Sequence, residues 1–247
     1  EILMSEKKVY SFSRLSSWDT CKLAFRYKYV DNIEGHDNWF SAFGTLAHYI
    51  FESVDKGEMK PEDAWGYWTS KYPELVLQNH PHTFGWQAKW YDETSDFFFT
   101  FKGWRTPAKK VEEYIEIDAG DYILRGYIDR ASLDTDGWVI TDHKSSNPFS
   151  AEDLLKKRRQ LYLYAEAIRQ TEGEFPKRLV FNFFRKKQFL VINFNESEFY
   201  EAWAWADSTV YEIEKAIATE GYDFNPTVSP FFCKNICDFR AICPYSR

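Results

Sequence analysis

Long apolar runs are missing from this 247-residue chain, and no stretch approaches the roughly 20 consecutive apolar residues that a transmembrane helix needs. The opening stretch EILMSEKKVY has no apolar core of a secretory signal. We therefore expect a cytoplasmic protein without a membrane partner. Repeats and helicase motifs are also missing, so a helicase or recombination partner would be a separate chain.

An excess of positive charge is missing too, because 31 Lys and Arg face 38 Asp and Glu and the net charge is −7. This balance argues against a protein that binds nucleic acid through its overall positive charge, but not against a local basic groove. Cysteine is scarce, with Cys21 near the start and Cys233, Cys237 and Cys243 near the end. In a reducing compartment their even number does not imply disulfides, so disulfide, zinc and iron–sulfur interpretations all stay open.

Apolar residues make up 44% of the chain and aromatic residues 19%, which is enough for one domain over residues 1–247. Apolar spacing and turn residues predict the following elements. They are a helix capped by Ser13 and running to residue 30, a helix over 41–54, a helical insertion over 57–107, a hairpin over 111–133, a strand over 138–144, a helix over 151–172 between Ser150 and Gly173, strands over 177–184 and 188–194, a helix over 196–221 and an irregular tail over 226–247. This order predicts an α/β or α+β core with a central mixed sheet flanked by helices.

The stretch GYIDRASLDTDGWVITDHKSS contains the most informative residues, Asp129, Asp142 and Lys144. Successive residues of a strand point to opposite faces, so Asp142 and Lys144 share one face and His143 points away. The DTDG turn lets the preceding strand bring Asp129 back beside them. Two carboxylates and an ammonium in one place can hold a divalent cation and hydrolyse a phosphodiester.

Further residues support this grouping. Gln160 and Tyr164 lie four apart on one face of the next predicted helix. His48 follows Gly44 by four residues on an early helix, where glycine would allow a close approach of the backbone. Two basic runs, 156–159 and 185–187, would as a rule form solvated faces, but their position next to the proposed site also allows contact with backbone phosphates.

These motifs together resemble the PD-(D/E)XK nuclease superfamily, in its RecB-like branch and most of all its iron–sulfur exonucleases of the AddB and CRISPR-associated protein four type. The matching pieces, in the family's order, are SFSRLSSWDTCKLAFRYKYV, GTLAHYIFE, GYIDRASL, ITDHKSS, QLYLYAEAI and the terminal cysteines. The resemblance implies a restriction-endonuclease-like core carrying the helical insertion and an iron–sulfur C-terminal segment. Ile128 stands where the family's proline would precede the first Asp.

The resemblance also implies roles for single residues. The metal ligands would be His48, Asp129, Asp142 and the backbone carbonyl of His143, for Mg²⁺ or Mn²⁺. Lys144 would be catalytic, and Gln160 and Tyr164 would support the site. Related sequences often carry a Glu on the strand before the first Asp, and Glu112, Glu113 and Glu116 compete for that place.

The cysteines resemble the [4Fe–4S] site of the same exonucleases. Cys233-x₃-Cys237-x₅-Cys243 would be joined by Cys21, so that segment 226–247 closes onto the start of the chain. The first gap is three residues, where the family more often has two. Four thiolates also satisfy a structural zinc, which favours short CxxC pairs.

The predicted function is a metal-dependent DNA exonuclease that acts on single strands with 5′→3′ polarity. Alternatives are an endonuclease or RNA-directed nuclease of the same fold, a non-catalytic DNA-binding or assembly subunit, and a zinc-stabilised adaptor. The sequence does not specify an oligomeric state, although a homo-oligomeric ring would keep an exonuclease on its strand.

Overall fold

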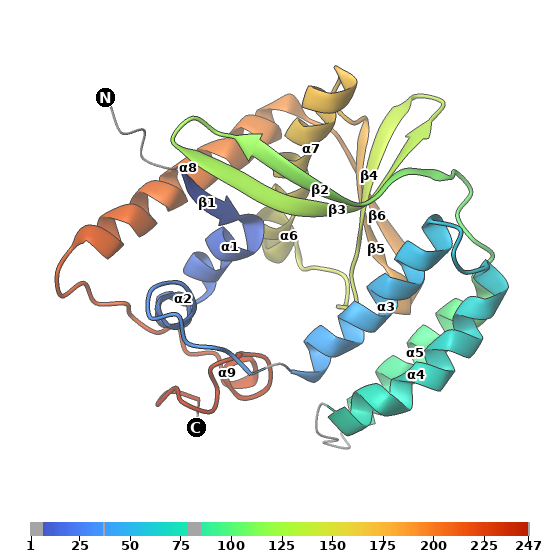
Figure 1. The fold of residues 1–247 in the computed structure, drawn as a ribbon, viewed down its shortest axis with the longest axis horizontal. Helices are drawn as coiled ribbons and strands as arrows, with labels where there is room; N and C mark the ends of the chain where they lie inside the picture. Colours follow the sequence, from blue (N-terminus) through green and yellow to red (C-terminus); the bar gives the residue numbers. More distant parts are fainter. Residues whose placement is uncertain (1–6, 37, 79–84, 247) are drawn as a thin grey trace. The chain divides into compact units, whose positions relative to one another are not determined.

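A computed structural model describes residues 7–36, 38–78 and 85–246 (Figure 1). The stretch before residue 7, and residues 79–84 of the predicted insertion, lie outside the described residues. Residue contacts divide the chain into two units. The first comprises Glu1–Asn38, Ile115–Gly126 and Glu196–Arg247, and the second comprises Trp39–Tyr114 and Tyr127–Asn195. Strands β2 (Ala108–Asp118) and β3 (Tyr122–Asp134), the predicted hairpin, belong partly to each.

The first unit begins with β1 (Lys8–Ser11), which pairs in parallel with the first half of β3. The predicted single helix is in fact two, α1 (Phe12–Thr20) and α2 (Lys22–Tyr29), because Cys21 between them is extended. Its cap is Ser11 rather than Ser13, since the Ser11 hydroxyl accepts a hydrogen bond from the Arg14 N–H. Helix α1 contacts α8 (Glu196–Ala218), and the tail contains the short helix α9 (Pro230–Asn235).

The second unit holds the other strand pairs. The second half of β3 pairs antiparallel with β4 (Gly137–His143), β4 pairs in parallel with β5 (Arg178–Phe183), and β5 pairs antiparallel with β6 (Gln188–Asn193). The strand order is β1-β3-β4-β5-β6, with β2 also paired to β3. A parallel pair needs a long crossover, and α6 (Ala151–Lys157) and α7 (Arg159–Glu172) provide it between β4 and β5. The mixed α/β fold class is thereby confirmed.

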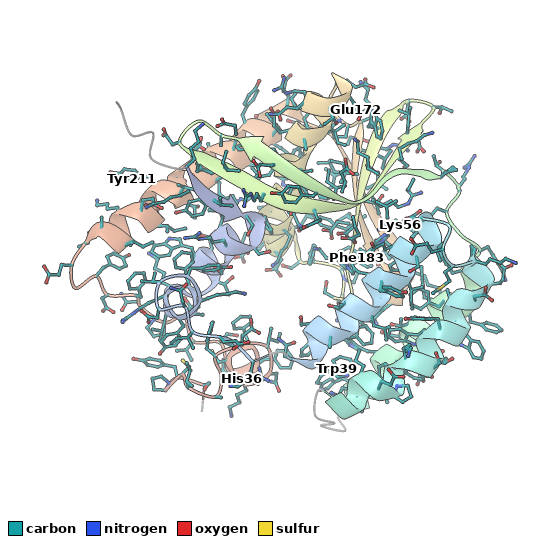
Figure 2. The ribbon with its side chains drawn as sticks, viewed as in Figure 1. His36, Trp39, Lys56, Glu172, Phe183 and Tyr211 are labelled. Atoms are coloured by element: carbon teal, nitrogen blue, oxygen red, sulfur yellow. The ribbon has the colours of Figure 1, made fainter. Side chains whose placement is uncertain are left out.

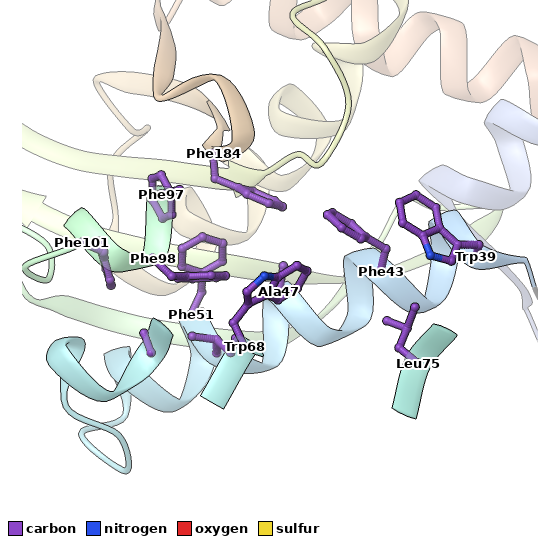
Figure 3. Packing of buried hydrophobic residues seen from close by; sticks show 12 residues of the cluster. Trp39, Phe43, Ala47, Phe51, Trp68, Leu75, Phe97, Phe98, Phe101 and Phe184 are labelled. Atoms are coloured by element: carbon purple, nitrogen blue, oxygen red, sulfur yellow. The ribbon is translucent and has the colours of Figure 1, made fainter. Parts of the chain in front are cut away.

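Helices α3 (Trp39–Asp55), α4 (Ala64–Gln78) and α5 (Gly85–Thr100) pack around an aromatic core, with the 3₁₀ turn η1 (Pro61–Asp63) before α4 (Figures 2 and 3). The labelled residues of this core include Phe43 and Phe51 of α3, Trp68 of α4 and Phe98 of α5 (Figure 3). Many of the rings meet edge to face or tilted, as Phe43 and Trp68 do with centroids 5.1 Å apart and planes inclined by 82°, and others are stacked, as Phe97 and Phe101 are. This core fixes α3, which carries one of the predicted metal ligands.

The second basic run pairs with acidic residues of α5. Arg185 is buried, stacks over the Trp90 ring at 3.6 Å and pairs with Glu93, which also binds Lys186. Lys187 pairs with Asp96 at 2.7 Å. These charges attach the 3₁₀ turn η2 (Phe184–Lys186) to α5, so Arg185 is too buried to contact a phosphate, whereas phosphate contact by Lys186 and Lys187 stays a prediction.

Within the described ranges, no helix combines the length and the apolar character that a membrane crossing requires.

Candidate active site

Two adjacent strands deliver the acidic residues. Arg130 of β3 lies opposite Thr141 of β4, so Asp129 and Asp142 occupy neighbouring positions on the two strands. The Asp129 carboxylate accepts a hydrogen bond of 2.8 Å from the His143 backbone N–H. The hairpin geometry expected from the DTDG turn therefore holds, and both carboxylates lie at the same end of β4.

Helix α3 brings His48 to the same place. The His48 Nε2 atom lies 2.9 Å from the His143 carbonyl oxygen, and its Nδ1 atom lies 3.6 Å from an Asp129 oxygen. Two turns along α3, Asp55 forms a buried ion pair of 3.1 Å with Arg130, the residue after Asp129. This pair fixes α3 against β3 beside the site.

Glycine at position 44 is not needed for this approach, contrary to expectation. A Cβ atom built on Gly44 would come no closer than 3.9 Å to a neighbouring atom, the Ser145 hydroxyl oxygen. That is an ordinary van der Waals distance, so an alanine would fit. The position of His48 is set instead by the aromatic core and the Asp55–Arg130 pair.

Glu112 of β2 is the third group beside His48. Its carboxylate lies 3.7 Å from His48 Nδ1, and single ligand atoms of His48, Glu112 and Asp129 all lie within 4.8 Å of one another. Its competitors are engaged elsewhere: Glu113 lies 3.6 Å from the Lys110 amine, and Glu116 lies 2.8 Å from the Arg125 guanidinium. Of the three glutamates, Glu112 is therefore the one that lies beside His48.

The backbone at Glu112 has a φ of 45°, in the left-handed region that side chains other than glycine rarely adopt. Such a conformation within a strand costs free energy and redirects the side chain, and it is concentrated at functional sites. No feature of the sequence predicts it, because a glutamate in a strand carries no signal for a positive φ.

His143 itself is held rigidly. Its ring is buried, stacks on Phe51 at 4.2 Å and on Trp104 at 5.2 Å, and its Nδ1 atom lies 3.0 Å from the Asn182 side-chain amide. Burial first, and then the positive charges nearby, hold the pKa of His143 well below its usual range. The ring is therefore neutral and structural, and it is the carbonyl of His143 that faces the site.

Lys144 is positioned by two contacts. Its amine lies 2.7 Å from an Asp142 oxygen and donates a hydrogen bond of 3.3 Å to the Gln160 side-chain oxygen. Gln160 in turn hydrogen-bonds the Tyr164 hydroxyl, which the Tyr127 backbone also contacts. Burial is the main reason that the pKa of Tyr164 rises to about 12. The predicted pair on α7 is thus joined to the lysine.

The described residues leave the site with an excess of buried negative charge. Burial and then the Asp142 charge raise the pKa of Asp129 to about 7. Burial alone would lower the pKa of His48, but the carboxylates around it, led by Glu112, raise it to about 9. Both shifts have the same consequence. In the absence of a cation, bound protons compensate the negative charge of the carboxylates.

The donor set fits a hard divalent cation. It offers carboxylate oxygens, one peptide carbonyl and one imidazole, a combination that suits Mg²⁺ or Mn²⁺. The Asp142 Oδ2 atom is buried and, among the described residues, has an ion pair with Lys144 but no contact with hydrogen-bond geometry. A buried carboxylate oxygen in that state has unused capacity for a cation.

Basic residues near the site come from the first run. Burial first, and then the charge of Lys144, lower the pKa of Lys157 on α6. Lys156 pairs with Glu152 on the same helix at 3.0 Å.

The four cysteines lie together in the first unit. All of them line one pocket, whose wall also includes Tyr27, Phe232 and Phe239. None forms a disulfide. Backbone N–H groups donate to two of the sulfurs, from Thr227 to Cys21 and from Ser229 to Cys233, each at 3.4 Å. Burial first, and then the neighbouring Cys21 and Cys243, raise the pKa of the Cys237 thiol.

Comparison with known proteins decides the family. Residues 9–244 match the profile of the PD-(D/E)XK nuclease superfamily. The chain belongs to the PD-(D/E)XK nuclease superfamily. A similar protein, the gene 69 protein of Mycobacterium phage D29, is 24% identical over 95% of this chain and 96% of its own length. The crystal structure of SSO0001 aligns with a TM-score of 0.42 and 17% identity over 99% of this chain and 89% of that one.

Membership of this PD-(D/E)XK superfamily supports metal-dependent cleavage of nucleic acid. The His48, Glu112 and Asp129 group offers one ligand atom from each residue, close enough together for a single metal ion.

Proposed function

We propose that this PD-(D/E)XK protein is a metal-dependent DNA exonuclease that degrades single-stranded ends, with 5′→3′ polarity. The observation that carries the proposal is the convergence of Asp129, Asp142, His48 and Lys144 on the carbonyl end of β4. Each of these positions holds a residue whose chemistry is competent for the reaction, which argues against a non-catalytic subunit.

The residues divide into ligands and a charge-positioning amine. His48, Asp129, Asp142 and the His143 carbonyl would hold the metal, together with Glu112. When bound, a divalent cation neutralises the phosphate, lowers the pKa of a water molecule and stabilises the leaving oxygen. Lys144, held by Asp142 and Gln160, can hold the attacking water or the transition-state charge in place.

Action on single strands is the part of the proposal that follows from the resemblance to exonucleases of this superfamily. No groove-reading motif is found in the sequence, so recognition of a base sequence is not indicated. Lys157 lies close to Lys144 electrostatically and can contact a backbone phosphate. A helicase or recombination partner that opens duplex DNA would supply such unpaired ends.

The test is cleavage of 5′- and 3′-end-labelled linear DNA and of closed circular single strands in Mn²⁺, comparing the wild type with Asp142→Ala. An exonuclease releases mononucleotides or short products from the linear strand and leaves circles intact, and Asp142→Ala abolishes this. Cleavage of circles would identify an endonuclease, and preference for a matched RNA would identify an RNA-directed enzyme. Cleavage by neither protein would refute the proposal.

We also propose that the cysteine pocket holds a [4Fe–4S] cluster that links Cys21 to segment 226–247. Four sulfurs around one pocket match the ligand count of a cubane cluster. A single zinc with Zn–S bonds of about 2.3 Å would hold its sulfurs only about 3.8 Å apart. Among the described residues, however, no three cysteine sulfurs lie within 4.8 Å of one another. Donation of N–H groups to two sulfurs is the usual environment of cluster thiolates.

Anaerobically purified protein should be brown, with four iron atoms per chain and charge-transfer absorption that Cys237→Ser weakens. A colourless protein that contains zinc in stoichiometric amount would refute the cluster. Such a site also suits a reducing, cytoplasmic setting.

A further inference from the structure

Two tyrosines on adjacent strands form an exposed aromatic pair next to the candidate active site. Tyr114 of β2 is 48% exposed and Tyr127 of β3 is 55% exposed. Their ring centroids lie 5.4 Å apart, with the planes inclined by 59°. Most of the other large aromatic side chains of this unit pack in its core; Trp65 and Phe99 form another exposed pair, but on α4 and α5 rather than on the strands that carry Glu112 and Asp129.

The position of Tyr127 is fixed relative to the catalytic groups. It precedes Asp129 by two residues on β3, so both side chains point to the same face, about 6.8 Å apart along the strand. The Tyr127 backbone also hydrogen-bonds the Tyr164 hydroxyl, which Gln160 connects to Lys144. Tyr114 follows Glu112 by two residues on β2, but the left-handed backbone at Glu112 interrupts the regular alternation there, so it is the contact of the Tyr114 ring with the Tyr127 ring that places it beside the site.

We propose that Tyr114 and Tyr127 are a stacking platform for the bases of single-stranded DNA next to the phosphate that is cleaved. The proposal rests on the proposed nuclease function and adds the part of the substrate that the site contacts. A tyrosine face stacks on any base, so the platform binds without sequence preference. In a duplex the bases stack on one another, so the platform selects unpaired strands.

The competing explanation is that the pair only stabilises the β2–β3 hairpin. A cross-strand aromatic pair contributes to stability whether or not a ligand is present. The two explanations differ in one respect: only a platform makes the effect of the tyrosine depend on the presence of a base.

The experiment is a binding cycle in the Lys144→Ala background, which prevents cleavage. The probe is a fluorescein-labelled oligothymidylate, either intact or with abasic positions at its end. Replacing Tyr127 or Tyr114 by Leu should weaken binding of the intact strand about 5- to 150-fold, the range for loss of one stacked base. The same replacements should leave binding of the abasic strand unchanged, and Tyr127→Phe should bind as the parent does.

Tyr211 of α8 provides a matched control (Figure 2). It is 68% exposed and belongs to the other unit, so Tyr211→Leu should bind the oligothymidylate as tightly as the parent does. Equal losses for the intact and the abasic strand, or no loss for either, would overturn the platform. If Tyr127→Leu folds poorly, the Lys144→Ala parent alone provides the test. Equal affinity of this parent for the intact and the abasic strand would also overturn the platform.

A substrate without bases distinguishes failure of the platform from failure of the nuclease. A strand end made of abasic nucleotides, incubated with Mn²⁺, needs the metal and Lys144 but offers no aromatic ring to the tyrosines. Tyr127→Leu should therefore hydrolyse it at the wild-type rate, while Lys144→Ala should not. If the wild type hydrolyses neither this strand nor intact DNA, the nuclease proposal itself fails, and the platform with it.

Discussion

The left-handed backbone at Glu112 makes an unusual prediction about glycine. A residue with a side chain in this region costs about 1–2 kcal/mol, whereas glycine adopts it freely. Glycine also loses about 0.5–1 kcal/mol through the greater entropy of its unfolded chain. Without metal, Glu112→Gly should therefore be as stable as the wild type or more stable by up to about 1.5 kcal/mol.

Glu113 provides the control, since it is the neighbouring glutamate, is not among the residues with positive φ, and makes only a 3.6 Å contact with Lys110. Glu113→Gly should lose about 0.5–1 kcal/mol, as glycine does in an ordinary strand. Urea unfolding in the presence of a chelator measures both variants.

The two variants should rank in the opposite order in metal affinity, with Glu112→Gly the weaker binder. Loss of the Glu112 carboxylate should weaken Mn²⁺ binding about 10- to 100-fold, the usual effect of losing a group that holds a metal ligand in place. Glu113→Gly should bind Mn²⁺ as the wild type does, and titration calorimetry measures both. The reasoning fails if Glu112→Gly is destabilised as much as Glu113→Gly and binds Mn²⁺ normally.

Three further predictions concern the metal, pH and the core. Mn²⁺ should support at least as much DNA cleavage as Mg²⁺, because an imidazole ligand favours Mn²⁺; clearly slower cleavage across a Mn²⁺ titration would argue against His48 as a ligand. The raised pKa values of Asp129 (about 7) and His48 (about 9) mean that the metal-free folded state binds extra protons, so its stability should fall as pH rises through these values. Mn²⁺ displaces those protons, so the rise in melting temperature that it causes should be larger at about pH 9 than at about pH 6, and a rise independent of pH would contradict this assignment. Phe51→Ala should lower the free energy of unfolding by about 3–5 kcal/mol, because the ring is buried against His143; Phe99→Ala, at a ring 65% exposed on α5, should change it by less than about 0.5 kcal/mol, and similar losses for both would contradict the packing described.

The part of the site that the sequence predicted follows from the two-residue period of strands. Alternation and a recognisable turn were enough to place Asp129 and Asp142 on adjacent strands and Lys144 beside them. Gln160 was predictable from helical spacing, because it needed only one face of a helix toward the lysine.

The remainder depended on tertiary contacts that the sequence does not display. The choice of Glu112 over Glu113 depends on one backbone dihedral, and the inward turn of Arg185 depends on Glu93 and Trp90 of a distant helix. The break between α1 and α2 at Cys21 could not be predicted, because no proline or glycine lies there.

The measurement that tests the central claim most directly is Mn²⁺ binding and DNA hydrolysis by Lys144→Ala. The proposed ligands Asp129, Asp142 and His48 would bind the metal without the lysine side chain, so this variant should bind Mn²⁺ and single-stranded DNA nearly as the wild type does. It should nevertheless hydrolyse no measurable DNA. Hydrolysis near the wild-type rate would contradict the account.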